Sequence, residues 1–293
     1  MTPFEEILAV RAAEAGLALT AAQIEQFAVY NRLLIAWNER MNLTALTAPE
    51  DVAVKHIIDS LTAYDAKLFA PARTLIDVGT GAGLPGIPLA VYAPQIEVTL
   101  MDALGKRVKF LTEAAAAMEL RNVRCIHARA EEAARRPEHR ARYDIAVSRA
   151  VARLPVLLEY ALPFVRTGGT LLALKGRAYA AEQAEGKRAA EILGGGAISA
   201  RPVRLPGLDD VRAILAEGAP DAEGVSAARG SAGACAAEII SPYKRVSDVH
   251  VEDYSGQRRC VCCTVFRKGA FGGIDARQPN TGCRKFFDRG ITR

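Results

Sequence analysis

Four glycines stand within eight residues directly after a short apolar run, a spacing typical of a loop that touches a ligand. They are Gly79, Gly81, Gly83 and Gly86. Glycine has no Cβ, so it lets the chain turn sharply and brings a ligand close to the backbone. Two patterns fit. Gly81-x-Gly83-x-x-Gly86 is a dinucleotide fingerprint, and Asp77-x-Gly79-x-Gly81-x-Gly83 matches the first motif of S-adenosylmethionine (SAM)-dependent methyltransferases.

Acidic residues follow the next two apolar runs. Asp102 ends the second run, and a carboxylate at that edge of a parallel sheet can accept both hydroxyl protons of a ribose, in NAD or in SAM. The alternative for Asp102 is a helix cap. Ala130 and Glu131 follow the third run, where they could border an adenine or form an ordinary acidic first turn of a helix.

Cations follow the fourth and fifth runs. Arg149 and Lys175 stand directly at the ends of these runs, with Arg153 and Arg177 close behind. Several cations at one sheet edge suit a polyanion better than a small neutral substrate. The Asn/Asp-Pro-Pro-aromatic run of many base-amino methyltransferases and the Pro-Cys nucleophile of pyrimidine C5 methyltransferases do not occur at this point.

The elements that must position these residues alternate between strand and helix. The apolar runs predict five strands, with helical segments between them. Because each run is apolar throughout, we expect a doubly wound, mainly parallel α/β sheet with helices on both faces. Helical periodicity before this region, with Thr20 as a cap, predicts an N-terminal helical cap over residues 1–70. The expected strands are 74–78, 97–102, 123–127, 143–148 and 169–175, and the expected helices 86–93, 105–119, 129–135 and 152–164.

Composition indicates a globular protein. Half of the 293 residues are hydrophobic and 24% are charged, which excludes a disordered chain. No apolar run approaches the ~20 residues of a membrane span, and the acidic N-terminus lacks the signature of a signal peptide. We therefore expect a cytoplasmic protein without membrane contact. The residues do not predict the oligomeric state, and a monomer is favoured over an oligomer.

The C-terminal third differs from the rest. Residues 71–208 form the expected core, residues 209–257 are predicted to be a flexible insertion rich in Ala, Gly and Ser, and residues 258–293 a final strand with a basic tail. The tail carries nine Lys/Arg and two Asp. Its cluster Cys260, Cys262 and Cys263 suggests zinc at first sight, but no second CxxC follows, so we interpret these cysteines as part of a buried strand and predict no metal.

Over residues 25–208 the chain resembles the RsmG (GidB) family, the bacterial 16S rRNA guanine-N7 methyltransferases. The resemblance rests on an ordered set of motifs, of which the glycine loop is only one. They are Trp37-Asn38-x-x-Met41-Asn42-Leu43-Thr44, His56-x-x-Asp59-Ser60, the loop at 76–89, Lys106-Arg107-x-x-Phe110-Leu111, Arg129-Ala130-Glu131, Ser148-Arg149-Ala150, Leu174-Lys175-Gly176 and Leu205-Pro206-Gly207. The C-terminus departs from the family pattern.

The resemblance implies a Rossmann-like class I SAM-dependent methyltransferase that methylates N7 of a guanine in the 530 loop of 16S rRNA. It implies that the partner is 16S rRNA or the small ribosomal subunit. It also implies SAM contacts at Gly79, Gly81, Gly83, Leu84, Asp102, Ala130, Glu131 and Arg149, RNA contacts at Asn42, His56, Lys175 and Arg177, and roles in turnover for Arg149 and Lys175.

Guanine N7 carries an in-plane lone pair and loses no proton when it is methylated, so the reaction needs no general base to make the nucleophile. The absence of the Asn-Pro-Pro and Pro-Cys motifs fits this chemistry. Two alternatives stay open: an NAD(P)-dependent oxidoreductase on the same fold, and a non-catalytic rRNA-binding assembly factor. No Tyr-x-x-x-Lys pair follows the fourth run, which disfavours the oxidoreductase.

Overall fold

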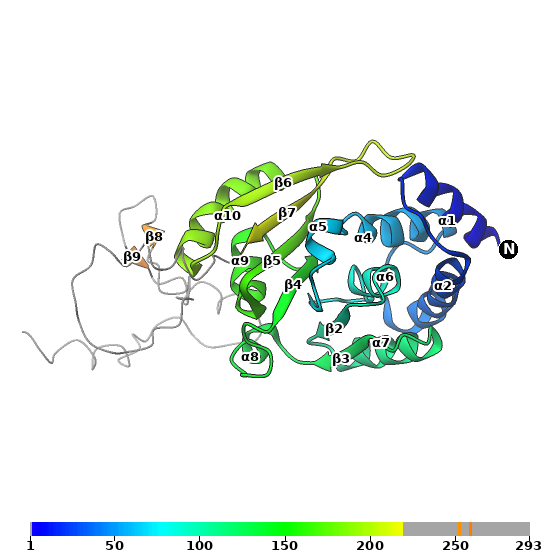
Figure 1. The fold of residues 1–293 in the computed structure, drawn as a ribbon, viewed down its shortest axis with the longest axis horizontal. Helices are drawn as coiled ribbons and strands as arrows, with labels where there is room; N and C mark the ends of the chain where they lie inside the picture. The colour runs from blue at the N-terminus through cyan, green and yellow to red at the C-terminus, as the bar shows by residue number, and fades with distance from the viewer. Residues whose placement is uncertain (1, 219–250, 253–257, 260–293) are drawn as a thin grey trace, which may run out of the picture. The chain divides into compact units, whose positions relative to one another are not determined.

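The structure is a computed structural model that describes residues 2–218, 251–252 and 258–259 (Figure 1). The chain divides into two compact units, Met1–Val246 and Ser247–Arg293. In the second unit the structure describes two short antiparallel strands, β8 (Val251–Glu252) and β9 (Arg258–Arg259). The first unit contains the large sheet and the helices around it.

The N-terminal part is helical, as predicted. Thr20 starts the second helix with a reciprocal cap, because its hydroxyl accepts the Gln23 N–H while the Gln23 side chain accepts the Thr20 N–H. A third helical stretch runs from Pro49 through a π-helical turn and ends at Leu61. The helices are α1 (Pro3–Glu14), α2 (Ala21–Met41), α3 (Pro49–Asp51), the π-helical segment Val52–Ile58, α4 (Asp59–Leu61) and α5 (Ala66–Phe69).

A seven-stranded sheet forms the centre of the first unit, in the order β3-β2-β1-β4-β5-β7-β6. The first five strands in sequence pair in parallel, and β7 runs antiparallel to both of its neighbours. The predicted doubly wound, mainly parallel sheet is therefore confirmed. The strands are β1 (Thr74–Val78), β2 (Glu97–Asp102), β3 (Val123–His127), β4 (Tyr143–Arg149), β5 (Val165–Lys175), β6 (Ile198–Val203) and β7 (Arg212–Gly218).

Helices cover both faces of this sheet, because successive strand residues point to opposite sides. In β1, Leu75 packs with the N-terminal helices, whereas the next residue, Ile76, packs against the other helical layer. Figure 1 shows α1, α2, α4, α6 and α7 on one side and α9 and α10 on the other. The remaining helices are α6 (Gly86–Tyr92), α7 (Gly105–Ala117), α8 (Ala130–Ala133), α9 (Leu154–Ala161), the 3-10 turn Leu162–Phe164 and α10 (Tyr179–Leu193).

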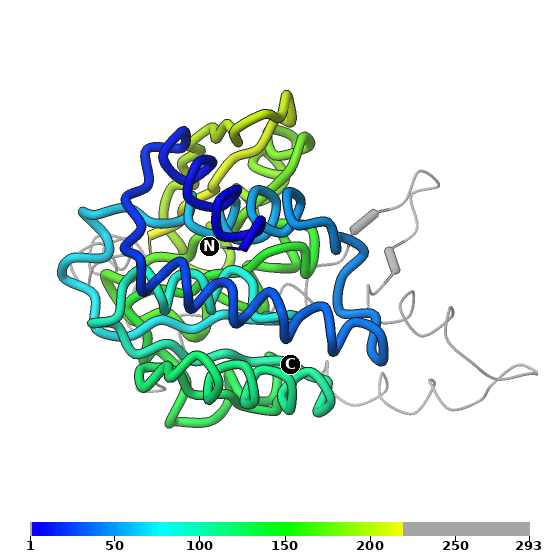
Figure 2. Tube along the Cα trace, turned by 90° about the vertical axis from the view of Figure 1, so that its right-hand side faces the viewer, coloured from blue at the N-terminus to red at the C-terminus, as the bar shows by residue number. Residues whose placement is uncertain are grey.

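The N-terminal helices are joined to the sheet through aromatic packing. In Figure 2, α2 runs beside α7. Between these helices the ring of Trp37 meets the ring of Phe110 edge-on, with 5.8 Å between the ring centroids. The buried Tyr30 hydroxyl donates a 2.7 Å hydrogen bond to the carbonyl of Ala82 in the glycine loop. The helical cap thus packs directly on the loop that the sequence marks for a ligand.

The predicted boundary at residue 208 is wrong. Strand β7 lies inside the segment 209–257 that the sequence assigns to an insertion, so the sheet continues to Gly218. Of residues 258–293, where the sequence predicts a final strand and a basic tail, only Arg258–Arg259 are described, and they pair with β8. Residues 219–250 and the cysteine cluster lie outside the described residues.

Within the residues that the structure describes, no helix has the length and apolar character needed to span a membrane. The same residues contain no group of three or more His, Cys, Asp or Glu side chains that could hold a metal ion.

Candidate functional site

The glycine loop between β1 and α6 adopts backbone conformations that favour glycine. Gly79, Gly81 and Gly83 have φ angles of +72°, +61° and +88°, in the left-handed region that side chains disfavour. A Cβ on Gly79 would lie 2.6 Å from Val151 Cγ2, whereas a Cβ on Gly81 would meet nothing within 4 Å. The loop is therefore packed at Gly79 and open at Gly81, where a ligand can approach the backbone.

Asp102 holds this loop in place. Its Oδ2 accepts the Gly81 N–H at 3.0 Å and the Arg107 guanidinium at 3.3 Å, and its Oδ1 accepts the Leu104 N–H at 2.8 Å. The side chain is buried, with 3% exposure. A carboxylate offers about four acceptor positions, so Asp102 retains roughly one for a ribose hydroxyl. Asp102 also closes the turn before α7 through the Leu104 N–H, but the N-cap of α7 is Leu104 and no side chain caps that helix, so the helix-cap interpretation is wrong. The ribose interpretation fits for one hydroxyl.

Asp77 is a second buried carboxylate at the same loop. Its Oδ2 accepts the Thr80 hydroxyl at 2.6 Å and the Gly86 N–H at 2.8 Å, while its Oδ1 has no hydrogen-bond partner among the described residues. Burial raises the pKa of Asp77 to about 7. A Cβ on Gly86 would lie 2.8 Å from Asp77 Oδ2, so glycine is required there for this contact. A buried carboxylate with a free oxygen suits a cationic group.

Ala130 and Glu131 open α8 at the edge where β2 and β3 end. Asp102 is paired in register with His127, three residues before Ala130. Ala130 is half-buried and Glu131 is exposed. The structure thus brings these two residues to the same edge as Asp102 and the glycine loop, as the sequence predicts.

A cavity of about 560 Å³ lies beside this edge, at the ends of β4 and β5. It is bounded by the helical segment 52–62, the chain after β4, and β7. Arg149 reaches from the end of β4 into the wall of this cavity. One guanidinium nitrogen, Nη1, donates to the Lys55 carbonyl at 3.0 Å and to Asp59 Oδ2 at 2.8 Å.

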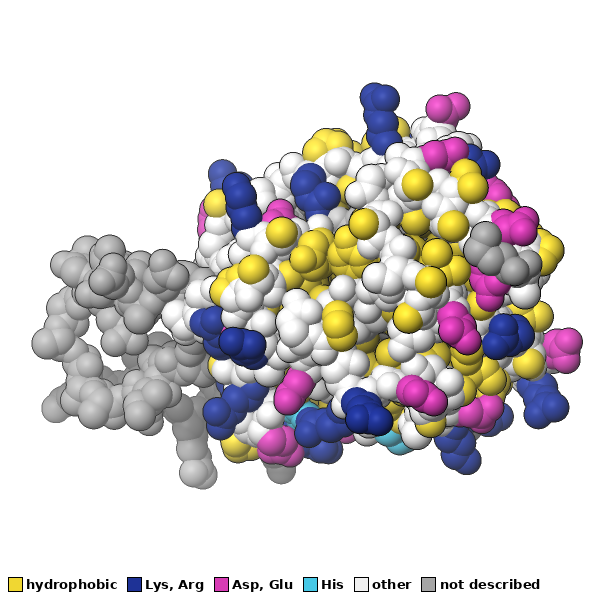
Figure 3. Space-filling view, turned by 45° about the vertical axis from the view of Figure 1, so that its right-hand side comes forward, with side chains coloured by type: hydrophobic (Ala, Val, Ile, Leu, Met, Phe, Trp, Pro, Cys, Tyr) yellow, Lys and Arg dark blue, Asp and Glu magenta, His cyan; other side chains and the backbone are white. Residues whose placement is uncertain are grey.

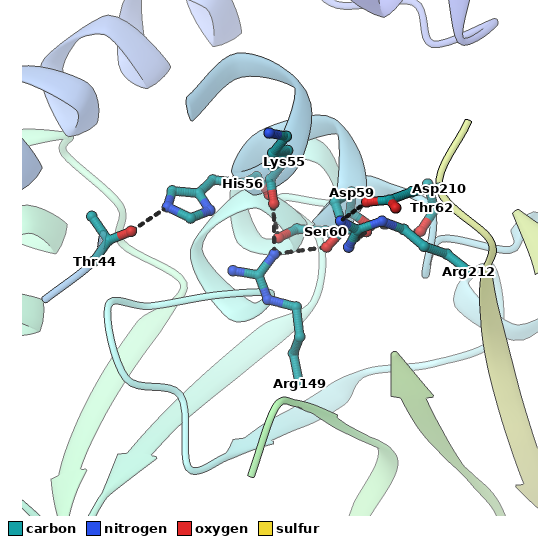
Figure 4. A network of polar contacts seen from close by, with 9 residues as sticks. All are labelled: Thr44, Lys55, His56, Asp59, Ser60, Thr62, Arg149, Asp210 and Arg212. Atoms are coloured by element: carbon teal, nitrogen blue, oxygen red, sulfur yellow. Dashed lines mark hydrogen bonds and ion pairs between the residues drawn. The ribbon is translucent and has the colours of Figure 1, made fainter. Parts of the chain in front are cut away.

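The carboxylate of Asp59 binds two arginines at once (Figure 4). Its Oδ2 accepts Arg149, and its Oδ1 accepts Arg212 from β7 at 3.1 Å. Asp59 is 3% exposed, and the side chains of Arg149 and Arg212 are 16% and 25% exposed. This buried Arg149–Asp59–Arg212 triad therefore joins the helical cap to two strands of the sheet.

His56 lines the same cavity one turn before Asp59. Its Nε2 lies 2.8 Å from the Thr44 hydroxyl, and its Nδ1 has no hydrogen-bond partner among the described side chains and backbone. Burial and the nearby Arg149 charge lower the pKa of His56 to about 4. The ring is therefore neutral at pH 7, with one nitrogen left for a ligand.

The other residues suggested for RNA contact are placed differently. Lys175 is buried: its Nζ donates to the Ala152 carbonyl at 2.6 Å and pairs with Glu182 at 2.7 Å. Arg177 is 80% exposed and pairs with Asp210. Asn42 is exposed and ends α2 in a left-handed conformation. The Lys175–Glu182 pair fits a positioning role better than direct RNA contact, and the roles of Arg177 and Asn42 stay predictions.

Residue types alone indicate no role for Asp59, Arg212 or Glu182, although Asp59 stands in the family motif His56-x-x-Asp59-Ser60. Asp59 and Ser60 interrupt an apolar helical stretch, and a buried polar residue in such a stretch is a usable signal. Arg212 gave no signal, because it stands in a segment that resembles an insertion.

Comparison with known proteins identifies the family. The profile described as "rRNA small subunit methyltransferase G" (GidB) matches residues 23–203. The chain belongs to this family. A "Ribosomal RNA small subunit methyltransferase G" of Alkaliphilus metalliredigens is 44% identical over 202 residues, which cover 69% of this chain and 84% of the relative. The Clostridium botulinum relative of the same name is 47% identical over 66% of this chain and 80% of its own length.

Among solved structures, a putative O-methyltransferase from Klebsiella pneumoniae superposes with a TM-score of 0.49 at 16% identity, covering 75% of this chain and 100% of its own. The family match spans the helical cap from α2 onward, the glycine loop and every strand of the sheet up to β6. Asp59 and Arg149 lie inside the matched region, whereas Arg212 lies beyond its end.

Proposed function

We propose that this chain transfers the methyl group of SAM to N7 of a guanine in the 530 loop of 16S rRNA. Membership in the rRNA small subunit methyltransferase G family carries the proposal. Geometry supports it, because an open glycine loop and a buried carboxylate lie at the same sheet edge as a cavity large enough for a nucleobase.

The residues around the loop fit SAM. Gly79, Gly81, Gly83 and Leu84 would contact it through the backbone, and Asp102 would accept a ribose hydroxyl. Ala130 and Glu131 would border the adenine, and Arg149 would lie near the methionine end. The free oxygen of Asp77 offers a partner for the ammonium group. SAM supplies an electrophilic methyl group on a sulfonium.

The cavity supplies orientation rather than acid–base chemistry. Guanine N7 attacks through its own lone pair, and the methylated ring becomes cationic. His56 is neutral because of its low pKa, so it does not repel the positively charged methylated guanine. Asp59 holds Arg149 at a fixed position in the wall. Fixing the base and excluding water can lower a barrier by up to ~7–11 kcal/mol.

The deciding experiment is methyl transfer from labelled SAM to small ribosomal subunits that lack this modification. We expect label at N7 of a 530-loop guanine, found by mapping the modified nucleotide. Because N7 is poorly accessible in A-form RNA, the target base must lie in an open or looped region. If the protein binds SAM but transfers no labelled methyl group to the rRNA, the remaining interpretation is a non-catalytic rRNA-binding assembly factor. Binding of NADH in place of SAM would support the oxidoreductase.

Replacing Asp102 by alanine is expected to weaken SAM binding at least tenfold. The change removes the ribose acceptor and also frees the Gly81 N–H that Asp102 holds. Titration calorimetry with SAM measures the loss. Replacing the exposed Glu97, at the other end of the same strand, is the matched control and should leave the affinity unchanged. If the Asp102 and Glu97 variants bind SAM with equal affinity, Asp102 is not part of the SAM site.

A further inference from the structure

The segment 121–142 is the most basic part of the described chain. It contains seven arginines and three glutamates, a net charge of +4. Residues 1–218 together carry 26 Lys/Arg and 25 Asp/Glu, so outside this segment they are net negative. The positive charge of the first unit is therefore concentrated in one short stretch around β3 and α8.

Three of these seven arginines lie around one hollow of the surface. Arg121, Arg124 and Arg142 line a cavity of about 450 Å³ where β1, β2, β3 and β4 begin. The His139 ring lies 3.0 Å from the hydroxyl of Tyr143 in the hollow, and the backbone N–H of His139 donates to the Arg136 carbonyl at 3.0 Å, so Arg136 lies close to the same hollow. Figure 3 shows dark blue side chains along the lower part of the molecule, with acidic ones among them. We call Arg121, Arg124, Arg136 and Arg142 the arginine edge.

Much of this charge has no internal partner. Arg121, Arg124 and Arg136 are exposed, and none of them forms an ion pair with the described residues. The cations around the large cavity differ, because Arg149, Arg153, Lys175 and Arg212 each pair with a carboxylate there. Two acidic residues, Glu97 and Glu138, also line the hollow, and the arginines outnumber them.

The arginine edge lies at the opposite end of the strands from the glycine loop. Strand β4 begins beside the hollow at Tyr143 and ends at Arg149 in the cavity wall. Seven residues at about 3.3 Å each separate the two ends by roughly 20 Å. A ligand that touches both ends must therefore be much larger than a nucleotide.

We propose that the arginine edge is a second RNA-binding surface, which holds phosphates of the small-subunit rRNA while the target guanine occupies the cavity at the other end of the sheet. This proposal rests on the proposed function. Guanidinium groups bind phosphate oxygens in a two-pronged geometry, and unpaired exposed arginines are available for it. Two contacts about 20 Å apart favour a large folded RNA over a short oligonucleotide.

The test compares two triple variants that remove the same charge. Arg121→Gln/Arg124→Gln/Arg136→Gln changes the arginine edge. Arg32→Gln/Lys187→Gln/Arg188→Gln changes three other exposed cations that have no ion pair among the described residues. For the first variant we expect a rise in KM for small ribosomal subunits of about tenfold, with SAM affinity unchanged. We also expect a shallower slope when the logarithm of the binding constant for subunits is plotted against the logarithm of the salt concentration. The change in slope should correspond to the loss of about two to three phosphate contacts.

Each outcome decides a different point. Equal KM values and equal salt slopes for the two triple variants would overturn the proposal. Loss of binding to subunits but not to protein-free 16S rRNA would also overturn it, and would indicate an acidic ribosomal protein as the partner. Failure of the unmodified protein to methylate subunits would instead refute the proposed function. Thermal unfolding of both variants verifies that they are folded.

Discussion

Replacing Asp59 by asparagine is expected to lower the free energy of unfolding by about 3–5 kcal/mol. The change leaves Arg149 and Arg212 beside each other in a largely buried position without their shared carboxylate. Removing one partner of a buried ion pair leaves an uncompensated charge, which costs more than the pair contributes. Urea denaturation followed by circular dichroism measures the difference.

The same change should reduce methyl transfer at least tenfold under single-turnover conditions. Asparagine at position 59 keeps one oxygen, which can accept from Arg149 or from Arg212, and it loses the ionic attraction to both. The position of the Arg149 guanidinium in the cavity wall is therefore less firmly fixed. SAM affinity should fall less than the rate does, because the glycine loop and Asp102 are untouched and only the contact of Arg149 near the methionine end is loosened. A positioning role therefore predicts a larger loss of rate than of cofactor binding, whereas general unfolding would abolish both.

Asp210→Asn is the matched control, since Asp210 also pairs with Arg212 but at the surface. Exposed pairs contribute at most about 1 kcal/mol, so this variant should stay close to the unmodified protein. In a double-mutant cycle, Asp59→Asn and Arg212→Gln should couple by roughly 0.5–3 kcal/mol. An Asp59→Asn protein as stable as the Asp210→Asn protein would show that the triad contributes nothing.

The parallel strands could be predicted because each signal is local. A strand buried on both faces is apolar throughout, and the glycines after Val78 mark where β1 ends. The starts of the first five strands agree within a few residues with the sequence, and β5 begins four residues earlier than expected, at Val165. The family resemblance supplied the cofactor and the reaction, which strand patterns alone leave open between SAM and NAD.

The C-terminal part of the sheet could not be predicted in the same way. Strand β7 follows an acidic, glycine-containing turn and leads into a long Ala- and Gly-rich stretch, so its apolar run does not stand out. Its assignment depends on antiparallel pairing with β5 and β6. Strand pairing of this kind depends on the neighbouring strands of the sheet, so the sequence of one segment alone does not predict it.

The triad shows the same limit at the site. Asp59 and Arg212 are separated by 153 residues, and neither residue type indicates the other. Lys175 is a case where the two partners are close in sequence. The sequence correctly predicts that Lys175 lies at the end of a strand, but it does not predict that Glu182 is its partner. Glu182 stands only seven residues later, yet the pair forms because α10 returns over the strand end.

Replacing Asp77 by asparagine is expected to make the protein relatively more stable at high pH. The folded pKa of Asp77 is raised to about 7, against about 3.9 in an unfolded chain. Between these values the folded state binds more protons, so this group lowers stability as pH rises through the interval and contributes its full penalty above pH 7. Asparagine has no such titration and can still accept from Thr80 and Gly86.

The measured quantity is the difference in unfolding free energy between the Asp77→Asn variant and the unmodified protein at pH 5 and pH 8. Between pH 5 and pH 8 this difference should change by roughly 2–3 kcal/mol, with the variant becoming relatively more stable at pH 8, since one pKa unit corresponds to about 1.4 kcal/mol. Burial also raises the pKa of Glu217, to about 8, so Glu217→Gln should show the same direction. Only the Asp77 change should weaken SAM binding, because Glu217 lies on β7, outside the glycine loop. A pH-independent difference for Asp77→Asn would mean that Asp77 is already ionised at pH 5.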